Sequence, residues 1–140
     1  MDPIRLFSII SWISLPTVMF GGYSLLRLIT RENNPLTPFQ ETYFRAGHAH
    51  AGVLLLLSLL YYNYLARTTF SDSLKWVACV VLVIGILAQS GGFFLHMGVG
   101  KPGRISAGTV VTSVGALLLA LVVLLLVYGL KIRPEFCSRV

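Results

Sequence analysis

Long apolar segments, each bounded by polar or charged residues, dominate the pattern of this chain. No lysine, arginine, aspartate or glutamate occurs from Ala46 to Ala66, which is long enough to cross a bilayer as a helix. The whole pattern predicts four spanning helices, at about residues 6–28, 44–66, 76–98 and 105–130. Short links between the last three favour antiparallel neighbours. We therefore expect an all-α, integral membrane four-helix bundle, formed as a single domain by residues 1–140.

Prolines modify this pattern at two places. Pro16 lies inside the first predicted helix and predicts a kink there, because proline removes a backbone donor. The segment Thr30–Thr42 contains Asn33, Asn34, Pro35 and Pro38, which is typical of a polar loop. The second helix is therefore expected to begin near Phe44.

Composition supports the membrane class and bears on how the net positive charge is interpreted. The chain is 56% hydrophobic and 11% charged, and its mean hydropathy is +0.80. The net charge of +6 comes from basic residues that flank the apolar segments, so lipid headgroups explain it better than nucleic acid. The positive-inside rule favours cytoplasmic termini, and we expect a bacterial inner membrane protein. Cys79 lies in an apolar segment and Cys137 near the C-terminus, so we expect no disulfide.

The candidate chemistry consists of three histidines. His48 and His50 lie near the start of the second helix, and His96 lies near the end of the third. Since neighbouring antiparallel helices begin and end on opposite faces, all three belong to one side of the membrane. Arg45, Lys101 and Arg104 belong to that side as well. Ionisable groups in spanning segments are costly, so a functional site is the default hypothesis.

Helical phase separates the first two histidines. His48 and His50 point about 200° apart around a helix, so they cannot both bind one small centre. Toward the membrane interior, the face of His96 carries Gly92, Gln89 and Gly85, which predicts a groove for a bulky group. The alternative is that these glycines let two helices approach closely. Each histidine also has a structural alternative, a hydrogen bond to a neighbouring helix.

Two segments carry a resemblance to a known family. Arg45–Gly52 resembles the Ala-Arg-Ala-His-Ser-Gly stretch of the styrene oxide isomerases, and Gln89–Leu95 resembles their Ser-Asn-Val-Gly-Phe-Tyr-Leu segment. Met19–Gly22 and Lys101–Gly103 fit the same order. The resemblance implies a four-helix membrane protein that assembles as a trimer around haem b. It also implies that ferric iron acts as a Lewis acid, which opens a small hydrophobic epoxide to an aldehyde.

Aligned residue by residue, the resemblance places the family's axial haem ligand at His50, with His48 at the position of an arginine. Three polar residues of the family are replaced, by Phe94, Leu56 and a position near Gly85. These replacements concern the groups that position the epoxide. The resemblance therefore predicts the haem scaffold more directly than the isomerase chemistry.

His96 has no counterpart in the family. We predict His50 as the principal iron ligand, with His96 at the second coordination position or just above it. If both bind iron, the haem is six-coordinate, which favours electron transfer. If the iron keeps an open position, a haem-dependent isomerase is the better hypothesis. In either case Arg45, Lys101 or Arg104 would neutralise the propionates, and Gln89 and Gly92 would line the cofactor.

Two alternatives from other classes remain open. A copper or zinc site would use side chains drawn from His48, His50, His96, Met97 and Glu41. A small structural subunit without chemistry of its own would need no cofactor. We also predict a homo-oligomer, with a trimer favoured, because four helices alone enclose a haem poorly. The fourth helix offers such an oligomer a close-packing face of small residues, Gly108, Thr112, Gly115 and Ala116.

Overall fold

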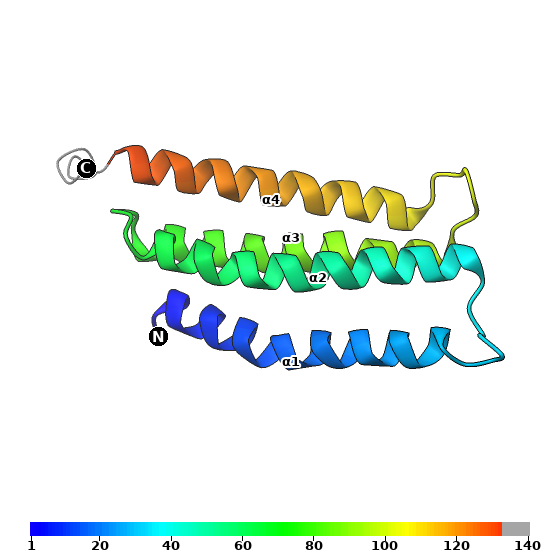
Figure 1. Ribbon diagram of the computed structural model, residues 1–140. Coiled ribbons are helices and arrows are strands. Elements are labelled where there is room, and N and C mark those ends of the chain that lie inside the picture. The colour runs from blue at the N-terminus through cyan, green and yellow to red at the C-terminus, as the bar shows by residue number, and fades with distance from the viewer. Residues whose placement is uncertain (133–140) are drawn as a thin grey trace.

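The computed structural model describes residues 1–132, so Cys137 lies outside the described residues. It contains four helices, α1 (Pro3–Ile29), α2 (Pro38–Leu65), α3 (Asp72–Val99) and α4 (Ala107–Lys131). The start of α1 and the end of α4 lie at one end of the molecule, and the α1–α2 and α3–α4 links lie at the other (Figure 1). The predicted all-α four-helix bundle is confirmed for these residues.

The second helix begins at Pro38, earlier than its predicted start near Phe44. Thr37 and Gln40 explain the difference, because they form a capping box. The Thr37 hydroxyl accepts a hydrogen bond from the Gln40 N–H at 3.3 Å, and the Gln40 side chain accepts one from the Thr37 N–H at 3.0 Å. Pro38 is compatible with the first helical position, where its missing N–H is not needed. The polar loop therefore ends before Pro38.

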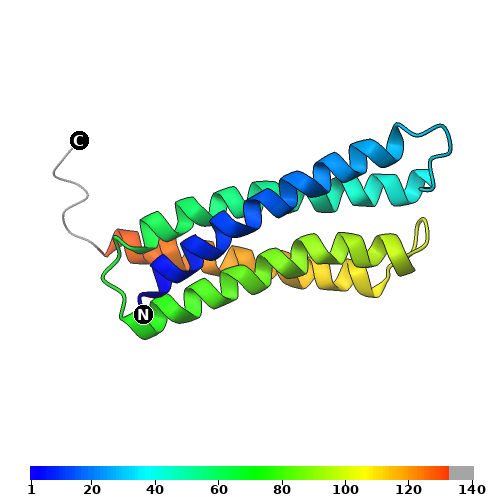
Figure 2. The ribbon, with the colours of Figure 1, turned by 90° about the horizontal axis from the view of Figure 1, so that it is seen from below.

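By length and composition, α1, α3 and α4 are long and apolar enough to cross a membrane. The remaining helix, α2, has 28 residues and lies beside the others along its length (Figure 2). His48, His50 and Asn63 lower its hydropathy. The chain thus has the helices of a membrane protein.

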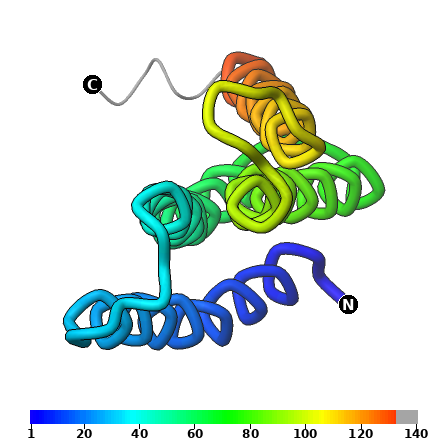
Figure 3. Tube along the Cα trace, turned by 90° about the vertical axis from the view of Figure 1, so that its right-hand side faces the viewer, coloured from blue at the N-terminus to red at the C-terminus, as the bar shows by residue number. Residues whose placement is uncertain are grey.

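The third helix lies at the centre of the bundle, with α1, α2 and α4 around it (Figure 3). Tyr62, Leu65 and Cys79 are fully buried where α2 and α3 meet in the half of the bundle near the start of α1. In the same core the Tyr61 hydroxyl donates a hydrogen bond to the Val122 carbonyl of α4 at 3.1 Å. This core holds together the half of the bundle opposite the histidines.

The first helix crosses α2 and α3 diagonally (Figure 2). Near its start Phe7 packs edge-on against Trp76 of α3, with ring centroids 5.7 Å apart. One turn later the Ser11 and Ser58 hydroxyls share a hydrogen bond of 2.9 Å. The helix continues through Pro16 and its axis bends midway along its length, as the sequence predicts (Figure 1).

Glycines bring the backbones of α3 and α4 into direct contact. A Cβ atom at Gly92 would overlap Thr112, one at Gly108 would overlap the backbone of His96, and one at Gly115 would overlap the backbone of Gln89. Close helix packing, the alternative interpretation of these glycines, is therefore what the structure shows. Within the small stripe of α4, Gly108 and Gly115 are buried against α3 of the same chain, whereas Ala116 is exposed.

We expect Gly92→Ala to lower the free energy of unfolding by about 1–3 kcal/mol, because the added methyl group forces α3 and α4 apart. Gly91→Ala is the matched control, since a Cβ at Gly91 meets no atom within 4 Å. It should leave stability unchanged or raise it by up to about 1 kcal/mol through helix propensity. Reversible unfolding in mixed detergent micelles measures both. Equal effects of the two substitutions would contradict the close α3–α4 contact.

Candidate functional site

The three histidines lie in the half of the bundle that faces the α1–α2 and α3–α4 links, as the topology predicts (Figure 1). They do not form one cluster. Among residues 1–132, no group of three or more His, Cys, Asp or Glu side chains is placed to hold a metal ion. Each histidine instead has its own surroundings, and these decide what each can do.

His50 is half-buried and held by its own helix. Its Nδ1 lies 2.8 Å from the Ala46 carbonyl oxygen, which can only accept, so Nδ1 carries the proton. The ring packs on Phe93 of α3, with centroids 4.7 Å apart. Its Nε2 has no hydrogen-bond partner within the described part of the chain. This tautomer leaves the Nε2 lone pair available to bind a metal ion.

His48 lies against α1, on the side of α2 away from Phe93. A Cβ atom at Gly22 would lie 2.7 Å from His48 Nε2, and one at Gly21 would lie 3.4 Å from Nδ1. The glycine pair thus makes room for the imidazole, and His48 fills the space between α1 and α2. The opposite directions of His48 and His50 agree with the predicted helical phase.

His96 is buried, with 5% of its surface exposed. Its Nδ1 lies 2.5 Å from the hydroxyl of Ser106, the N-cap of α4, and 3.2 Å from the Thr109 hydroxyl. Its ring also packs on Tyr43 of α2, with centroids 4.4 Å apart. His96 therefore joins α3 to the start of α4 and to α2.

Aromatic rings stand between the two histidines that the sequence places on one iron. The centroid of Phe93 is 4.7 Å from His50, that of Tyr43 is 4.4 Å from His96, and the two aromatic rings are 6.4 Å apart. His50 and His96 thus belong to one row of rings but contact different neighbours within it.

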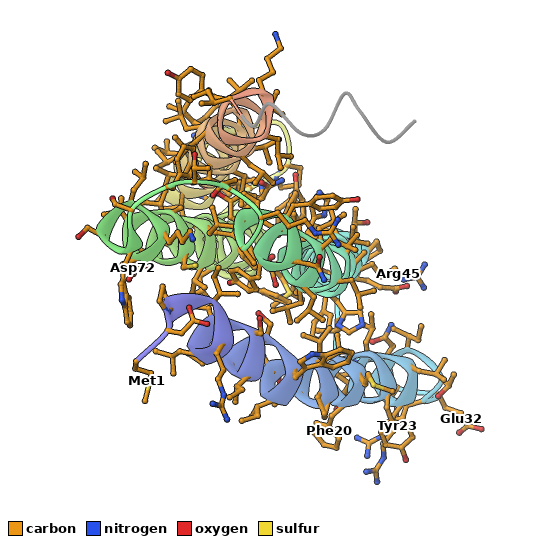
Figure 4. All side chains as sticks on the ribbon, turned by 90° about the vertical axis from the view of Figure 1, so that its left-hand side faces the viewer. Met1, Phe20, Tyr23, Glu32, Arg45 and Asp72 are labelled. Carbon is orange, nitrogen blue, oxygen red and sulfur yellow. The ribbon has the colours of Figure 1, made fainter. Side chains whose placement is uncertain are left out.

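The predicted cations lie at the surface of this end. Arg45 forms an ion pair with Glu41, one turn earlier in α2, and its side chain is 58% exposed. It projects from the outer edge of the bundle (Figure 4). Lys101 and Arg104 are exposed in the α3–α4 link. All three can reach anionic groups at the membrane interface.

The remaining predicted cofactor residues, Gly92 and Gln89, lie at the α3–α4 contact. Gly92 is buried beneath α4, and the Gln89 carbonyl accepts a long hydrogen bond of 3.5 Å from the Thr112 hydroxyl. The backbone of α4 occupies the groove expected below His96. The backbones of these two residues therefore contact a helix of the same chain.

Five residues that contact the histidines were missed from the sequence: Tyr43, Phe93, Phe39, Ser106 and Thr109. The three aromatic residues pack on the imidazole rings. The first two look like ordinary apolar positions, and nothing in the pattern distinguishes them. Ser106 does carry a signal, because a serine directly before an apolar helix is a strong N-cap candidate. That signal locates the start of α4, but it does not reveal the contact with His96.

Comparisons with protein-family models, with curated proteins and with solved structures found no match for this chain. Any functional proposal therefore depends on the chain's own residues. The strongest of them is His50, because its Nδ1 is held within its own helix, its ring packs on Phe93, and its Nε2 has no partner in the described structure.

We expect Ser106→Ala to lower the free energy of unfolding by about 1–2 kcal/mol, because it removes the α4 cap and the hydrogen bond to His96. Ser106→Thr keeps the hydroxyl and should lie close to the wild type. Ser113→Ala is the control, since Ser113 is exposed and bonds only to the Thr109 carbonyl of its own helix. Unfolding in mixed micelles tests the series. A Ser106→Ala protein as stable as the wild type would contradict this role.

Proposed function

We propose that this protein binds haem b in the membrane through His50 and acts as an isomerase of small hydrophobic epoxides. The observation that carries the proposal is the orientation of His50, whose Nδ1–H is fixed on the Ala46 carbonyl while Nε2 stays free. Metal-binding histidines commonly have this arrangement, because the second hydrogen bond fixes the tautomer and the direction of the ring. The resemblance to styrene oxide isomerases, in which His50 occupies the axial position, supports the same assignment.

The residues around His50 fit a haem with one protein ligand. The Nε2 of His50, without a partner in the described structure, would supply a nitrogen ligand to the iron, and Phe93 offers an apolar wall. Lys101 and Arg104 are exposed at the same end of the bundle, where charge-assisted hydrogen bonds to propionates would form. Arg45 is already paired with Glu41, so a propionate would have to share the Arg45 charge with that carboxylate. A single chain encloses a planar macrocycle poorly, so we propose that the protein works as a homo-oligomer, with a trimer favoured.

The contacts of His96 favour one axial histidine over two. Tyr43 covers its ring toward α2, with centroids 4.4 Å apart. Bringing its Nε2 to the iron on His50 would require Tyr43 and Phe93 to leave the space between them. A haem with one protein ligand keeps an open position, which favours substrate chemistry over electron transfer.

When bound, ferric haem would supply a Lewis acid for the epoxide oxygen. The chain's own contribution is to orient the His50 ring and to exclude water. The Ala46 carbonyl sets the direction of His50, and Phe93 stabilises the plane of its ring. Phe94 and Leu56 replace polar residues of the resembled family, so at these positions the chain offers apolar contact and no hydrogen bonds. We therefore propose that substrates are oriented by shape.

A histidine series tests the cofactor. We expect the protein, purified in detergent with haem b, to show a Soret band that His50→Ala abolishes. His48→Ala is the control, because His48 faces α1, and it should keep the band. His96→Ala should also keep it with the same spin state, since His96 has its partners in α4 and α2. A low-spin spectrum that turns high-spin in His96→Ala would favour the bis-histidine alternative.

A normal haem spectrum in His50→Ala would refute the assignment of the ligand. Elemental analysis of the same sample addresses the other classes. Stoichiometric copper or zinc without a Soret band would favour a metal site formed between chains, because the described residues of one chain bring no three ligands together. Neither haem nor metal would favour a structural subunit.

The reaction has its own test. Haem-loaded protein should convert styrene oxide to phenylacetaldehyde, measured by gas chromatography, with ferric iron more active than ferrous iron. His50→Ala should reduce the rate at least about tenfold, because the metal site is lost, and His48→Ala should keep most of it. A haem-loaded protein without aldehyde formation would leave haem binding intact and refute the isomerase.

A further inference from the structure

A cavity of about 510 Å³ lies between α1 and α3, with α2 as its floor. Most of its wall is aliphatic, and Ala51 and Leu55 form the floor. Four hydroxyl side chains also line it: Ser11, Ser14, Thr17 and Ser90. His50 is not among the lining residues, so this cavity is separate from the proposed haem site. Its volume is in the usual range for small-molecule sites.

The bend of α1 accounts for the cavity. The helix contacts α2 through the Ser11–Ser58 hydrogen bond on one side of the bend and through the Gly22–His48 contact on the other, and Val18 lies near Gly52 between them. Pro16 lies between them and cannot donate to the preceding turn. The bend lies along this stretch of α1, and the cavity occupies the space between it and α3.

The hydroxyl protons of the cavity can be accounted for one by one. Ser14 donates to the Ile10 carbonyl at 2.8 Å, and Thr17 donates to the Ser14 carbonyl at 2.6 Å. Since the Ser58 proton goes to the Leu55 carbonyl at 2.7 Å, Ser11 must donate within the Ser11–Ser58 pair. Three of the four hydroxyl residues thus have an acceptor for their proton.

Ser90 is the exception. Its side chain is buried, with 6% of the residue exposed, and its hydroxyl has no hydrogen-bond partner in the described structure. Serines in spanning helices usually donate to a carbonyl one turn earlier, as Ser14 and Ser113 do. Burying a hydroxyl without a partner is unfavourable, so an unpaired donor at a cavity wall indicates a missing acceptor.

We propose that this cavity binds a small, uncharged, mostly apolar molecule with one acceptor oxygen, to which the Ser90 hydroxyl donates a hydrogen bond. The ligand enters sideways from the bilayer between α1 and α3. Ile10 and Leu87 border that opening and are 40% and 67% exposed. A lipid tail could fill the volume but offers no oxygen at this depth, so it would leave Ser90 unpaired. The inference goes beyond the proposed function and holds with or without haem.

The test compares two probes of the same shape. Acetophenone carries a carbonyl oxygen, and α-methylstyrene carries a methylene group in its place. Equilibrium dialysis of the purified full chain in detergent measures both affinities against protein-free micelles. We expect acetophenone to bind about three- to tenfold more tightly, the contribution of one hydrogen bond. Its carbonyl stretch should shift to lower frequency when bound.

Three variants make the test specific. Ser90→Ala should remove the advantage of acetophenone and the infrared shift, and it should not impair folding, because it deletes an unpaired group. Ser113→Ala, on the far helix, should change neither. Gly91→Leu should weaken both probes, since it projects into open space at the cavity wall. Equal affinities for the two probes, an unchanged infrared shift in Ser90→Ala, or no binding above that of empty micelles would each overturn the proposal.

Discussion

The direct contact between the backbones of α3 and α4 is the constraint on which the other interactions depend. Helices in a bilayer gain little from burying apolar surface against each other, so close packing and hydrogen bonds between helices must hold them. Gly92, Gly108 and Gly115 allow this approach, and they also fix how far α4 is shifted along α3. That shift places the Ser106 cap on the His96 ring. A different register would leave both groups without partners.

The same register sets the neighbours of His96, and the other two histidines have neighbours of their own. His96 is occupied in joining α3 to α4, and His48 fills the space beside Gly22 of α1. His50 bonds through Nδ1 within its own helix, and its Nε2 has no partner among residues 1–132. A group of three histidines on one side of a membrane suggests a shared centre. Here the packing of the helices gives each histidine neighbours of its own.

The sequence predicts what depends on position along one helix, and it fails where two helices must be placed against each other. The four helices, the common end of the histidines and the opposition of His48 and His50 follow from length and phase alone. The start of α2 was missed because the Thr37–Gln40 capping box outweighs the prolines around it. The glycines below His96 predict a close approach of some kind, but their partner is set by the docking of α4. The rings between His50 and His96 depend on the offset between α2 and α3, which no single-helix pattern contains.

Packing is uneven across the bundle, and this bears on how a ligand could reach its interior. The α3–α4 pair is joined by backbone contacts that tolerate no added atom at Gly92 or Gly108. The first helix makes far fewer contacts with α3, and a cavity lies between the two helices. Because local opening occurs first where few contacts must break, α1 can separate from α3 while the tight pair stays intact. A molecule dissolved in the bilayer would then exchange beneath α1 without disturbing the helices that hold His50 and His96.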